Sequence, residues 1–150
     1  LLFYYNDGFF CLHLAARPLV SLEMSVNILL IDDDEDICTA LGDGLRKRGF
    51  NVKTYSNPRQ ALDEFEKKRY HKIILDIRMP QMNGFDVAKQ IWAKDPEARI
   101  CFLSAFEIYE KEAKMVFKDL KDVCFIKKPI LASELARRIT ENMHDVKIRL

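Results

Sequence analysis

Short apolar segments alternate with segments of helical period from residue 26 onward, and this alternation restricts the fold more than any other feature. The five apolar segments are VNILLID (26–32), FNVKTYS (50–56), HKIILD (71–76), ARICFLS (98–104) and VCFIK (123–127). All but 50–56 are apolar almost throughout, which is typical of strands in a parallel sheet covered on both faces. Segment 50–56 alternates apolar and polar residues, which predicts an edge strand with one wet face.

Between these strands, apolar residues recur about four positions apart, as on one face of an α-helix. The first predicted helix is 35–49 and ends at Gly49, and the second runs from 58 to about 65 with Asn57 as its cap. Two more helices are predicted at 84 to about 92 and at about 107–120. The last helix is marked by four apolar residues at four-residue spacing: Leu131, Leu135, Ile139 and Met143. Strands and helices that alternate and are joined by right-handed crossovers predict an α/β fold. We therefore expect a doubly wound, five-stranded parallel sheet with helices on both faces.

Composition and charge indicate one domain without a strongly charged surface. Of the 150 residues, 49% are hydrophobic, which is enough for a single core. The net charge is +1, from 24 basic and 23 acidic residues. This balance offers no electrostatic attraction to nucleic acid or to a membrane surface, so we predict that the domain binds neither directly.

The first 23 residues differ from the rest of the chain. Their apolar clusters are interrupted by Asn6, Gly8 and Pro18, so they are too broken to span a bilayer. No basic region precedes an apolar stretch, which makes a signal peptide a poor interpretation. We predict that 1–23 is a disordered leader or a start-site artefact, that the domain covers 24–146, and that 147–150 is a tail; an amphipathic extension packed on the domain is the alternative.

The cysteines show neither metal-binding nor redox spacing. None of Cys11, Cys38, Cys101 and Cys124 forms a C-x-x-C pair, and no Cys/His set has zinc spacing. Cys101 and Cys124 lie inside apolar runs and are interpreted as small buried hydrophobic residues with free thiols. Free thiols favour a reducing cytoplasm as the location.

Polar side chains follow the strands where each one ends. Strand 26–32 leads into Asp32, Asp33 and Asp34, and strand 71–76 ends in Asp76. The last two strands lead into Ser104 and into Lys127 and Lys128, respectively. In a doubly wound sheet, ligands bind beyond the carboxyl ends of the strands, so these groups are predicted to gather at one edge.

That set of groups fits phosphoryl chemistry. Neighbouring carboxylates repel one another unless a cation lies among them, and oxygen ligands suit Mg²⁺ or Mn²⁺. A lysine and a serine hydroxyl could bind phosphoryl oxygens, while one carboxylate acts as the nucleophile and forms an aspartyl phosphate. Each motif alone also has a structural interpretation: an acid after a strand is commonly a helix cap, and Lys-Pro is commonly a turn. Only their joint placement at one edge favours a site.

Four motifs carry a family resemblance: ILLIDDDED, IILDIRMPQMNG, FLSA and FIKKP. In this order they make the chain similar, from about Val26 to Asp145, to the response-regulator receiver domains of two-component signalling, the CheY-like family. The resemblance implies a flavodoxin-like sheet with strand order 2-1-3-4-5. It also implies that Asp76 is the phosphoacceptor, and that Asp32, Asp33 and Asp76 hold Mg²⁺ or Mn²⁺ with the backbone carbonyl of Arg78.

The resemblance also implies a switch. Ser104 would turn toward the phosphoryl group, Phe125 would swing inward, and Lys128 would bind a phosphoryl oxygen, with a cis bond between Lys128 and Pro129. The readout surface would be the helix 4–strand 5–helix 5 face, used by a downstream target or a dimer. Arg78 and Phe106 stand at variable positions of the family pattern, and we predict that their bulk slows hydrolysis of the acyl phosphate.

The implied partner is a sensor histidine kinase or a phosphotransfer protein, and the domain would catalyse only its own phosphorylation and dephosphorylation. One rival is a Mg²⁺-dependent phosphohydrolase with an Asp nucleophile, which would place a second acid where Arg78 stands. The other rival is a receiver-like binding module that never uses phosphate. The intact set of site residues argues against it: Asp32, Asp33, Asp76, Ser104 and Lys128.

Overall fold

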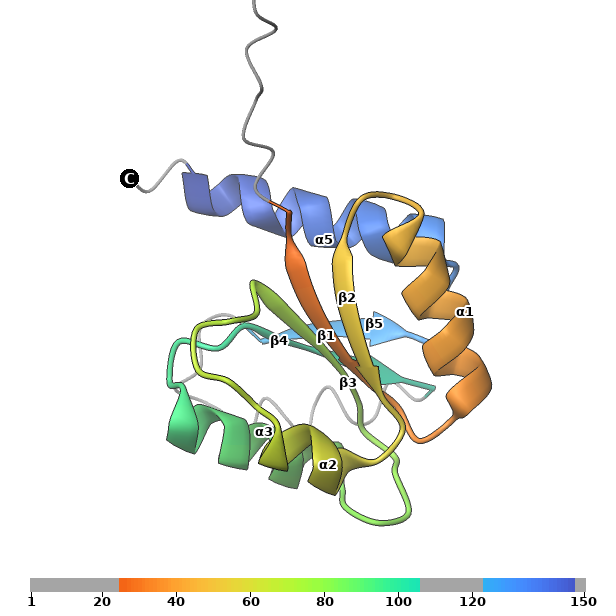
Figure 1. Ribbon diagram of the computed structural model, residues 1–150. Helices are drawn as coiled ribbons and strands as arrows, with labels where there is room; N and C mark the ends of the chain where they lie inside the picture. Colours follow the sequence, from red (N-terminus) through yellow and green to blue (C-terminus); the bar gives the residue numbers. More distant parts are fainter. Residues whose placement is uncertain (1–24, 106–122, 148–150) are drawn as a thin grey trace, which may run out of the picture.

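A computed structural model describes residues 25–105 and 123–147, which form a parallel sheet between two layers of helices (Figure 1). The strands are β1 (Asn27–Ile31), β2 (Asn51–Tyr55), β3 (Lys72–Asp76), β4 (Ile100–Ser104) and β5 (Cys124–Lys127). They pair in parallel in the order β2-β1-β3-β4-β5. The predicted fold class and strand order are therefore confirmed.

The helices divide between the two faces of the sheet. Their bounds are α1 (Glu35–Arg46), α2 (Pro58–Asp63), α3 (Gly84–Lys94) and α5 (Ala132–Lys147). Helices α1 and α5 cover one face, and α2 and α3 cover the other (Figure 1). The helix predicted near 107–120, the leader 1–23 and residues 148–150 of the tail lie outside the described residues.

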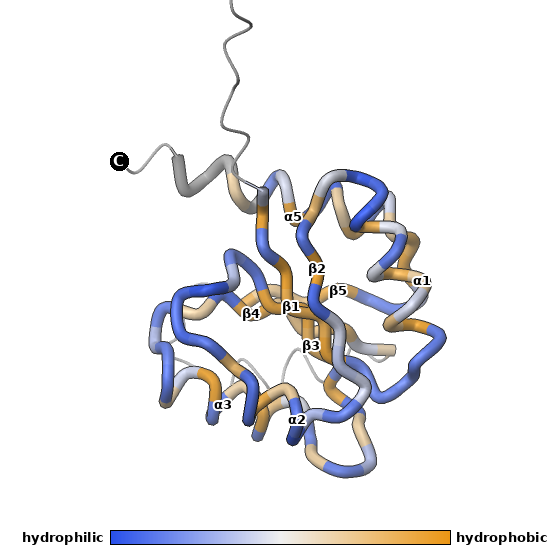
Figure 2. The backbone as a smooth tube through the Cα atoms, in the orientation of Figure 1, coloured by the Kyte–Doolittle hydropathy of each residue, from blue (hydrophilic) through white to orange (hydrophobic). Residues whose placement is uncertain are grey.

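The two faces have separate cores because strand side chains alternate between them. Along β1, Leu29 and Ile31 join the core under α2 and α3, whereas Ile28 and Leu30 join the core under α1 and α5. The inner strands β1 and β3 therefore run as largely apolar segments through the centre of the molecule (Figure 2), whereas β2 mixes apolar and polar residues. No helix in the described part of the chain is both apolar enough and long enough to cross a membrane.

Three predicted helix boundaries shift in the structure. Helix α1 ends at Arg46, and Gly49 adopts a left-handed φ of 89° in the turn after it. Helix α2 ends at Asp63, so Phe65 lies beyond it and stacks on Tyr70. Leu131 precedes α5 and is 75% exposed, so it is not part of the buried helix face. Four-residue spacing alone could not locate these ends, because a turn can continue the same apolar period.

The prediction of free thiols is wrong for two of the cysteines. Cys101 and Cys124 are opposite each other on β4 and β5, with Cα atoms 4.5 Å apart, and form a disulfide. The error arose because pairing depends on strand register, which spacing along the chain does not reveal. Among the described residues, Cys38 is a free and buried cysteine.

Candidate functional site

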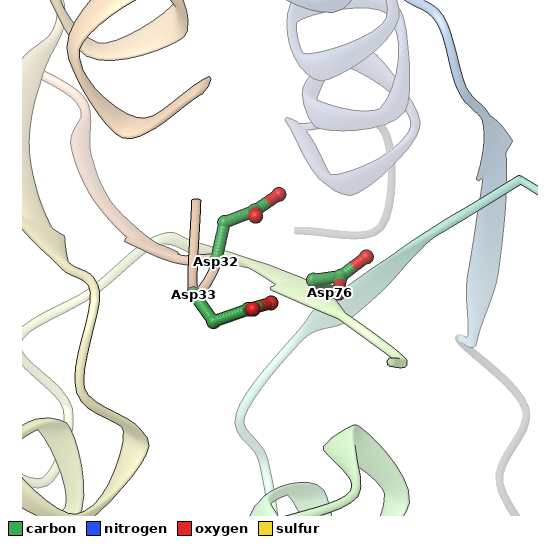
Figure 3. A group of neighbouring side chains, drawn as sticks. All are labelled: Asp32, Asp33 and Asp76. Carbon is green, nitrogen blue, oxygen red and sulfur yellow. The ribbon is translucent and has the colours of Figure 1, made fainter. Parts of the chain in front are cut away.

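Three carboxylates lie together at the carboxyl edge of the sheet (Figure 3). Asp32 and Asp33 follow β1, and Asp76 is the last residue of β3. Asp32 and Asp76 are 1% and 5% exposed, whereas Asp33 is solvent-exposed. One carboxylate oxygen from each lies within 4.8 Å of the other two, so the group could hold a metal ion.

The acidic residues after β1 have two roles: one caps helix α1, and the others belong to the site. The Asp34 carboxylate accepts hydrogen bonds from the backbone N–H groups of Asp36 and Ile37 and so caps α1. The N–H of Asp34 in turn donates to Oδ1 of Asp32 at 3.1 Å, which fixes that buried carboxylate. The ordinary capping interpretation therefore applies to Asp34, which leaves Asp32 and Asp33 to face Asp76.

Lys128 supplies a cation inside this carboxylate group. Its Nζ donates to Oδ2 of Asp32 at 2.6 Å and lies 2.8 Å from Oδ1 of Asp76. It comes directly after β5, and its peptide bond to Pro129 is cis, as expected. The neighbouring Lys127 is exposed. A single ammonium group thus offsets the charge of two buried carboxylates.

Burial and charge shift the ionisation of the site in defined directions. Burial raises the pKa of Asp76, and hydrogen bonding to Lys128 offsets only part of that increase; the nearby charges of Asp32 and Asp33 add to it. Burial opposes the charge on Lys128, but its hydrogen bonds to Asp32 and Asp76 outweigh burial and raise its pKa. Lys128 therefore stays charged beside Asp76. The Asp76 carboxylate can exchange its contact with this ammonium for a contact with a new ligand.

The hydroxyl and aromatic residues of the predicted switch lie on the two strands beyond β3. Ser104 ends β4, is 8% exposed, and accepts a backbone hydrogen bond from Lys128 at its carbonyl oxygen, 2.8 Å away. Phe125 of β5 is half-buried, and its ring stacks on that of Phe102 with centroids 5.4 Å apart. Arg78 is exposed in the loop after Asp76, and Phe106 lies outside the described residues.

Two residues outside the predicted set of site residues, Gly84 and Cys38, also position the site. The Gly84 N–H donates to the Ile77 carbonyl, and a Cβ at Gly84 would overlap the carbonyl oxygen of Asp76. Only glycine therefore allows α3 to start this close to the strand end. Cys38 lies beneath the acidic run, where its thiol donates to the Asp32 carbonyl, and burial raises its pKa to about 11. A glycine at the helix start was a usable signal, whereas nothing in the sequence marked Cys38.

Comparison with known proteins identifies the family. Residues 28–140 match the family model of the response regulator receiver domain. The chain belongs to this family. The receiver domain is 32% identical over 115 residues to the transcriptional regulatory protein PrrA of Mycobacterium tuberculosis, covering 77% of this chain and 48% of PrrA. It is 30% identical over 116 residues to the alkaline phosphatase synthesis transcriptional regulatory protein PhoP of Bacillus subtilis, covering 77% of this chain and 48% of PhoP. The chain spans about half the length of these relatives.

Solved structures agree with this assignment. The chemotaxis response regulator CheY4 of Vibrio cholerae superposes with a TM-score of 0.68 at 26% identity, covering 79% of this chain and 98% of CheY4. The response regulator protein TrrA of Thermotoga maritima, in complex with Mg²⁺-BeF, gives 0.65 at 28% identity and covers 78% of this chain and 98% of TrrA. This chain is therefore a receiver domain of two-component signalling in both sequence and fold.

Proposed function

We propose that Asp76 accepts a phosphoryl group from a phosphohistidine on a sensor histidine kinase or a phosphotransfer protein. The observation that carries this proposal is the ammonium of Lys128, held 2.6 Å from Asp32 and 2.8 Å from Asp76 at the carboxyl edge of the sheet. A helix cap would need no such cation. A carboxylate that must meet a negatively charged phosphoryl group does need one.

In the proposed transfer, an oxygen of the Asp76 carboxylate attacks phosphorus in line with the donor nitrogen. The phosphorus–nitrogen bond breaks, and its electron pair returns to the donor imidazole, which then takes up a proton. Lys128 loses its contact with the Asp76 oxygen that becomes acylated and binds a phosphoryl oxygen instead. Its contact with Asp32 keeps the ammonium in place throughout.

The donor set fits Mg²⁺ or Mn²⁺, because three carboxylates lie together and one of them is open to solvent. Asp33, Asp76 and the backbone carbonyl of Arg78 would hold the ion, with Asp32 completing the acidic pocket. When bound, such an ion neutralises charge on phosphoryl oxygens. The likeness to TrrA, whose structure contains Mg²⁺-BeF, supports this assignment.

Phosphorylation would act through a two-state switch. The Ser104 hydroxyl would bind the phosphoryl group, and Phe125 would move inward along the stack that it shares with Phe102. The changed surface would include β5 and α5, and would meet a downstream target or a second copy; the predicted helix 4 of this face lies outside the described residues. We place this signalling role in the cytoplasm and assign the domain no substrate other than its own Asp76.

Incubation of the full chain with acetyl phosphate and Mg²⁺, followed by intact mass measurement, tests this function. The wild type should gain the mass of one phosphoryl group, and Asp76→Asn should gain none, because an amide is a poor nucleophile. Asp63→Asn, which changes an exposed aspartate at the end of α2, is the matched control and should be modified like the wild type. An unmodified wild type would refute the proposal, and steady turnover of a phosphomonoester would favour the phosphohydrolase instead.

Arg78 is expected to set the lifetime of the acyl phosphate. Its side chain is exposed two residues after Asp76, where it can cover the phosphoryl group and hinder the approach of water. Arg78→Asn should shorten the half-life of phosphorylated Asp76 by about tenfold, which corresponds to a barrier lowered by about 1.4 kcal/mol. The half-life is measured as phosphate release after removal of acetyl phosphate. Arg59→Asn, at an exposed position of α2, should leave the half-life unchanged. Equal half-lives for Arg78→Asn and the wild type would rule out shielding by this side chain.

A further inference from the structure

The disulfide joins the two strands that the proposed switch uses. Cys101 of β4 and Cys124 of β5 are register partners and belong to the core under α1 and α5. The next pair along the strands, Phe102 and Phe125, belongs to the opposite face. The proposed phosphotransfer needs neither sulfur atom, so the pair requires a separate explanation.

A disulfide is unusual in the location proposed for this domain. Reducing compartments keep thiols reduced, and the disulfides that do form there are mostly transient, catalytic or regulatory. We propose that Cys101 and Cys124 form a reversible dithiol–disulfide couple, and that its oxidation by a low-molecular-weight disulfide locks β5 against β4 and opposes the phosphorylation switch. The first half of this proposal rests on the proposed cytoplasmic location, and the second half rests in addition on the proposed phosphorylation of Asp76.

Access to the two sulfur atoms differs, which sets the order of events. Cys101 is 1% exposed, whereas Cys124 is half-buried and lines a surface pocket of about 250 Å³. The pocket is lined by Cys124, Phe125, Ile126, Arg137, Arg138 and Glu141. A small disulfide can therefore reach Cys124 first, and Cys101 only through Cys124.

The exchange balances in two steps. The Cys124 thiol loses its proton, and its thiolate attacks one sulfur of the small disulfide, which releases one small thiolate and leaves a mixed disulfide. Cys101 then loses its proton, attacks the Cys124 sulfur and releases the second small thiolate. The cysteine pair gives up two electrons, the small disulfide accepts them, and the two protons end on the two released thiols. Attack of a small thiolate on Cys124 reverses the sequence.

The position of the bond explains why it should oppose switching. The paired residues run in order from Cys101–Cys124 through Phe102–Phe125 and Leu103–Ile126 to Ser104–Lys127. The Phe102–Phe125 pair thus follows the disulfide directly along the strands, with its stacked rings on the opposite face, and Ser104 lies two pairs beyond it. A covalent bond at one end of this short strand pair restricts the sliding and rotation of β5 that inward movement of Phe125 requires.

The chain carries its own reporter for this movement. Trp92 is the single tryptophan of the sequence, and its ring lies edge-on to Phe102 with centroids 6.5 Å apart. Because Phe102 contacts both Trp92 and Phe125, movement of Phe125 should change the surroundings of the indole. Trp92 fluorescence therefore follows the switch without any added label.

The first experiment tests the couple alone. The full chain is equilibrated in glutathione buffers from strongly reducing to strongly oxidising, alkylated, and mapped by peptide mass spectrometry. We expect linked Cys101 and Cys124 peptides to replace the two alkylated ones as the buffer becomes oxidising, with Cys38 unlinked. Cys101→Ala should trap glutathione on Cys124, whereas Cys124→Ala should leave Cys101 unmodified. A pair that stays in one state across the series, or glutathione trapped on Cys101, would overturn the assignment.

The second experiment tests the coupling. Acetyl phosphate and Mg²⁺ are added to the dithiol form, the disulfide form and a Cys101→Ala/Cys124→Ala variant, and phosphorylation is quantified by intact mass. We expect the same phosphorylation in all three, but a fluorescence change in Trp92 that is largely lost in the disulfide form alone. Equal fluorescence changes at equal phosphorylation would overturn the locking. Absence of phosphorylation in all three would instead refute the proposed function and with it the coupling, and would leave the couple to be judged by the peptide map.

Discussion

Lys128→Met is expected to lower the unfolding free energy by about 3 kcal/mol at neutral pH, because it leaves two buried carboxylates without a cation. Asp32 and Asp76 are 1% and 5% exposed, so water cannot replace the lost ammonium. Methionine keeps most of the side-chain length, which isolates the effect of the charge. Phosphorylation by acetyl phosphate should also become about a hundredfold slower, since a charged group that faces the developing phosphoryl charge is gone.

The pH dependence of this effect has a definite sign. Removal of Lys128 takes away the main influence that lowers the pKa of Asp76, so that pKa rises further in the variant. A carboxyl that is protonated in the folded state carries no uncompensated charge. The stability difference between variant and wild type should therefore shrink as the pH falls toward the ordinary aspartate pKa of 3.8.

Urea unfolding followed by circular dichroism, with and without Mg²⁺, measures these effects. Mg²⁺ should stabilise Lys128→Met more than the wild type, because the ion then meets carboxylates that no ammonium neutralises. Lys127→Met is the matched control: this lysine precedes Lys128 and is exposed, so its replacement should cost less than about 1 kcal/mol. Equal losses for the two variants would contradict a special role for Lys128.

Phe102→Ala is expected to lower the unfolding free energy by about 4 kcal/mol, a large share of the stability of a domain this size. Phe102 is fully buried at the centre of an aromatic group. Its ring is edge-on to Phe85 at 5.0 Å and to Trp92 at 6.5 Å, and it stacks on Phe125 at 5.4 Å. Truncation removes these contacts together and leaves a cavity that three large rings cannot easily fill.

In Phe102→Ala, phosphorylation of Asp76 should no longer be accompanied by a change in Trp92 fluorescence. Phe102 is the ring that joins Trp92 to Phe125, so Trp92 fluorescence should no longer respond when Asp76 is phosphorylated. Stability is measured by urea unfolding followed by circular dichroism, because Trp92 itself is perturbed. Leu131→Ala removes a large apolar side chain that is 75% exposed and should cost less than about 0.5 kcal/mol. A loss below about 1 kcal/mol for Phe102→Ala would contradict its role as the centre of this core.

Much of the fold could be predicted because the periodicity of the chain reflects which faces are buried. The nearly continuous apolar runs that end in Asp76 and Ser104 indicated strands covered on both faces, and all of the predicted strands are present. The ends of helices were less predictable. Leu131 continues the four-residue spacing of α5 yet lies outside the helix, because spacing does not show where a turn begins.

For the site, the amino-acid sequence alone was enough to predict which groups meet. Parallel strands expose all of their carboxyl ends at one edge, so acids and lysines that follow those strands must gather there. It did not determine how they pair. Only the tertiary structure showed that Lys128 contacts Asp32 as well as Asp76, and that Gly84 is required by the carbonyl of Asp76.

The disulfide is a second contact that could not be predicted from the sequence. The apolar residues around Cys101 and Cys124 predicted that both are buried; Cys101 is, and the half-buried Cys124 packs against the same core. Whether two such cysteines face each other depends on which residues of neighbouring strands are register partners, and a shift of one residue would place their side chains on opposite faces. Burial is therefore encoded locally, in the hydropathy of each segment. Contact between distant residues is decided by the register of the assembled sheet.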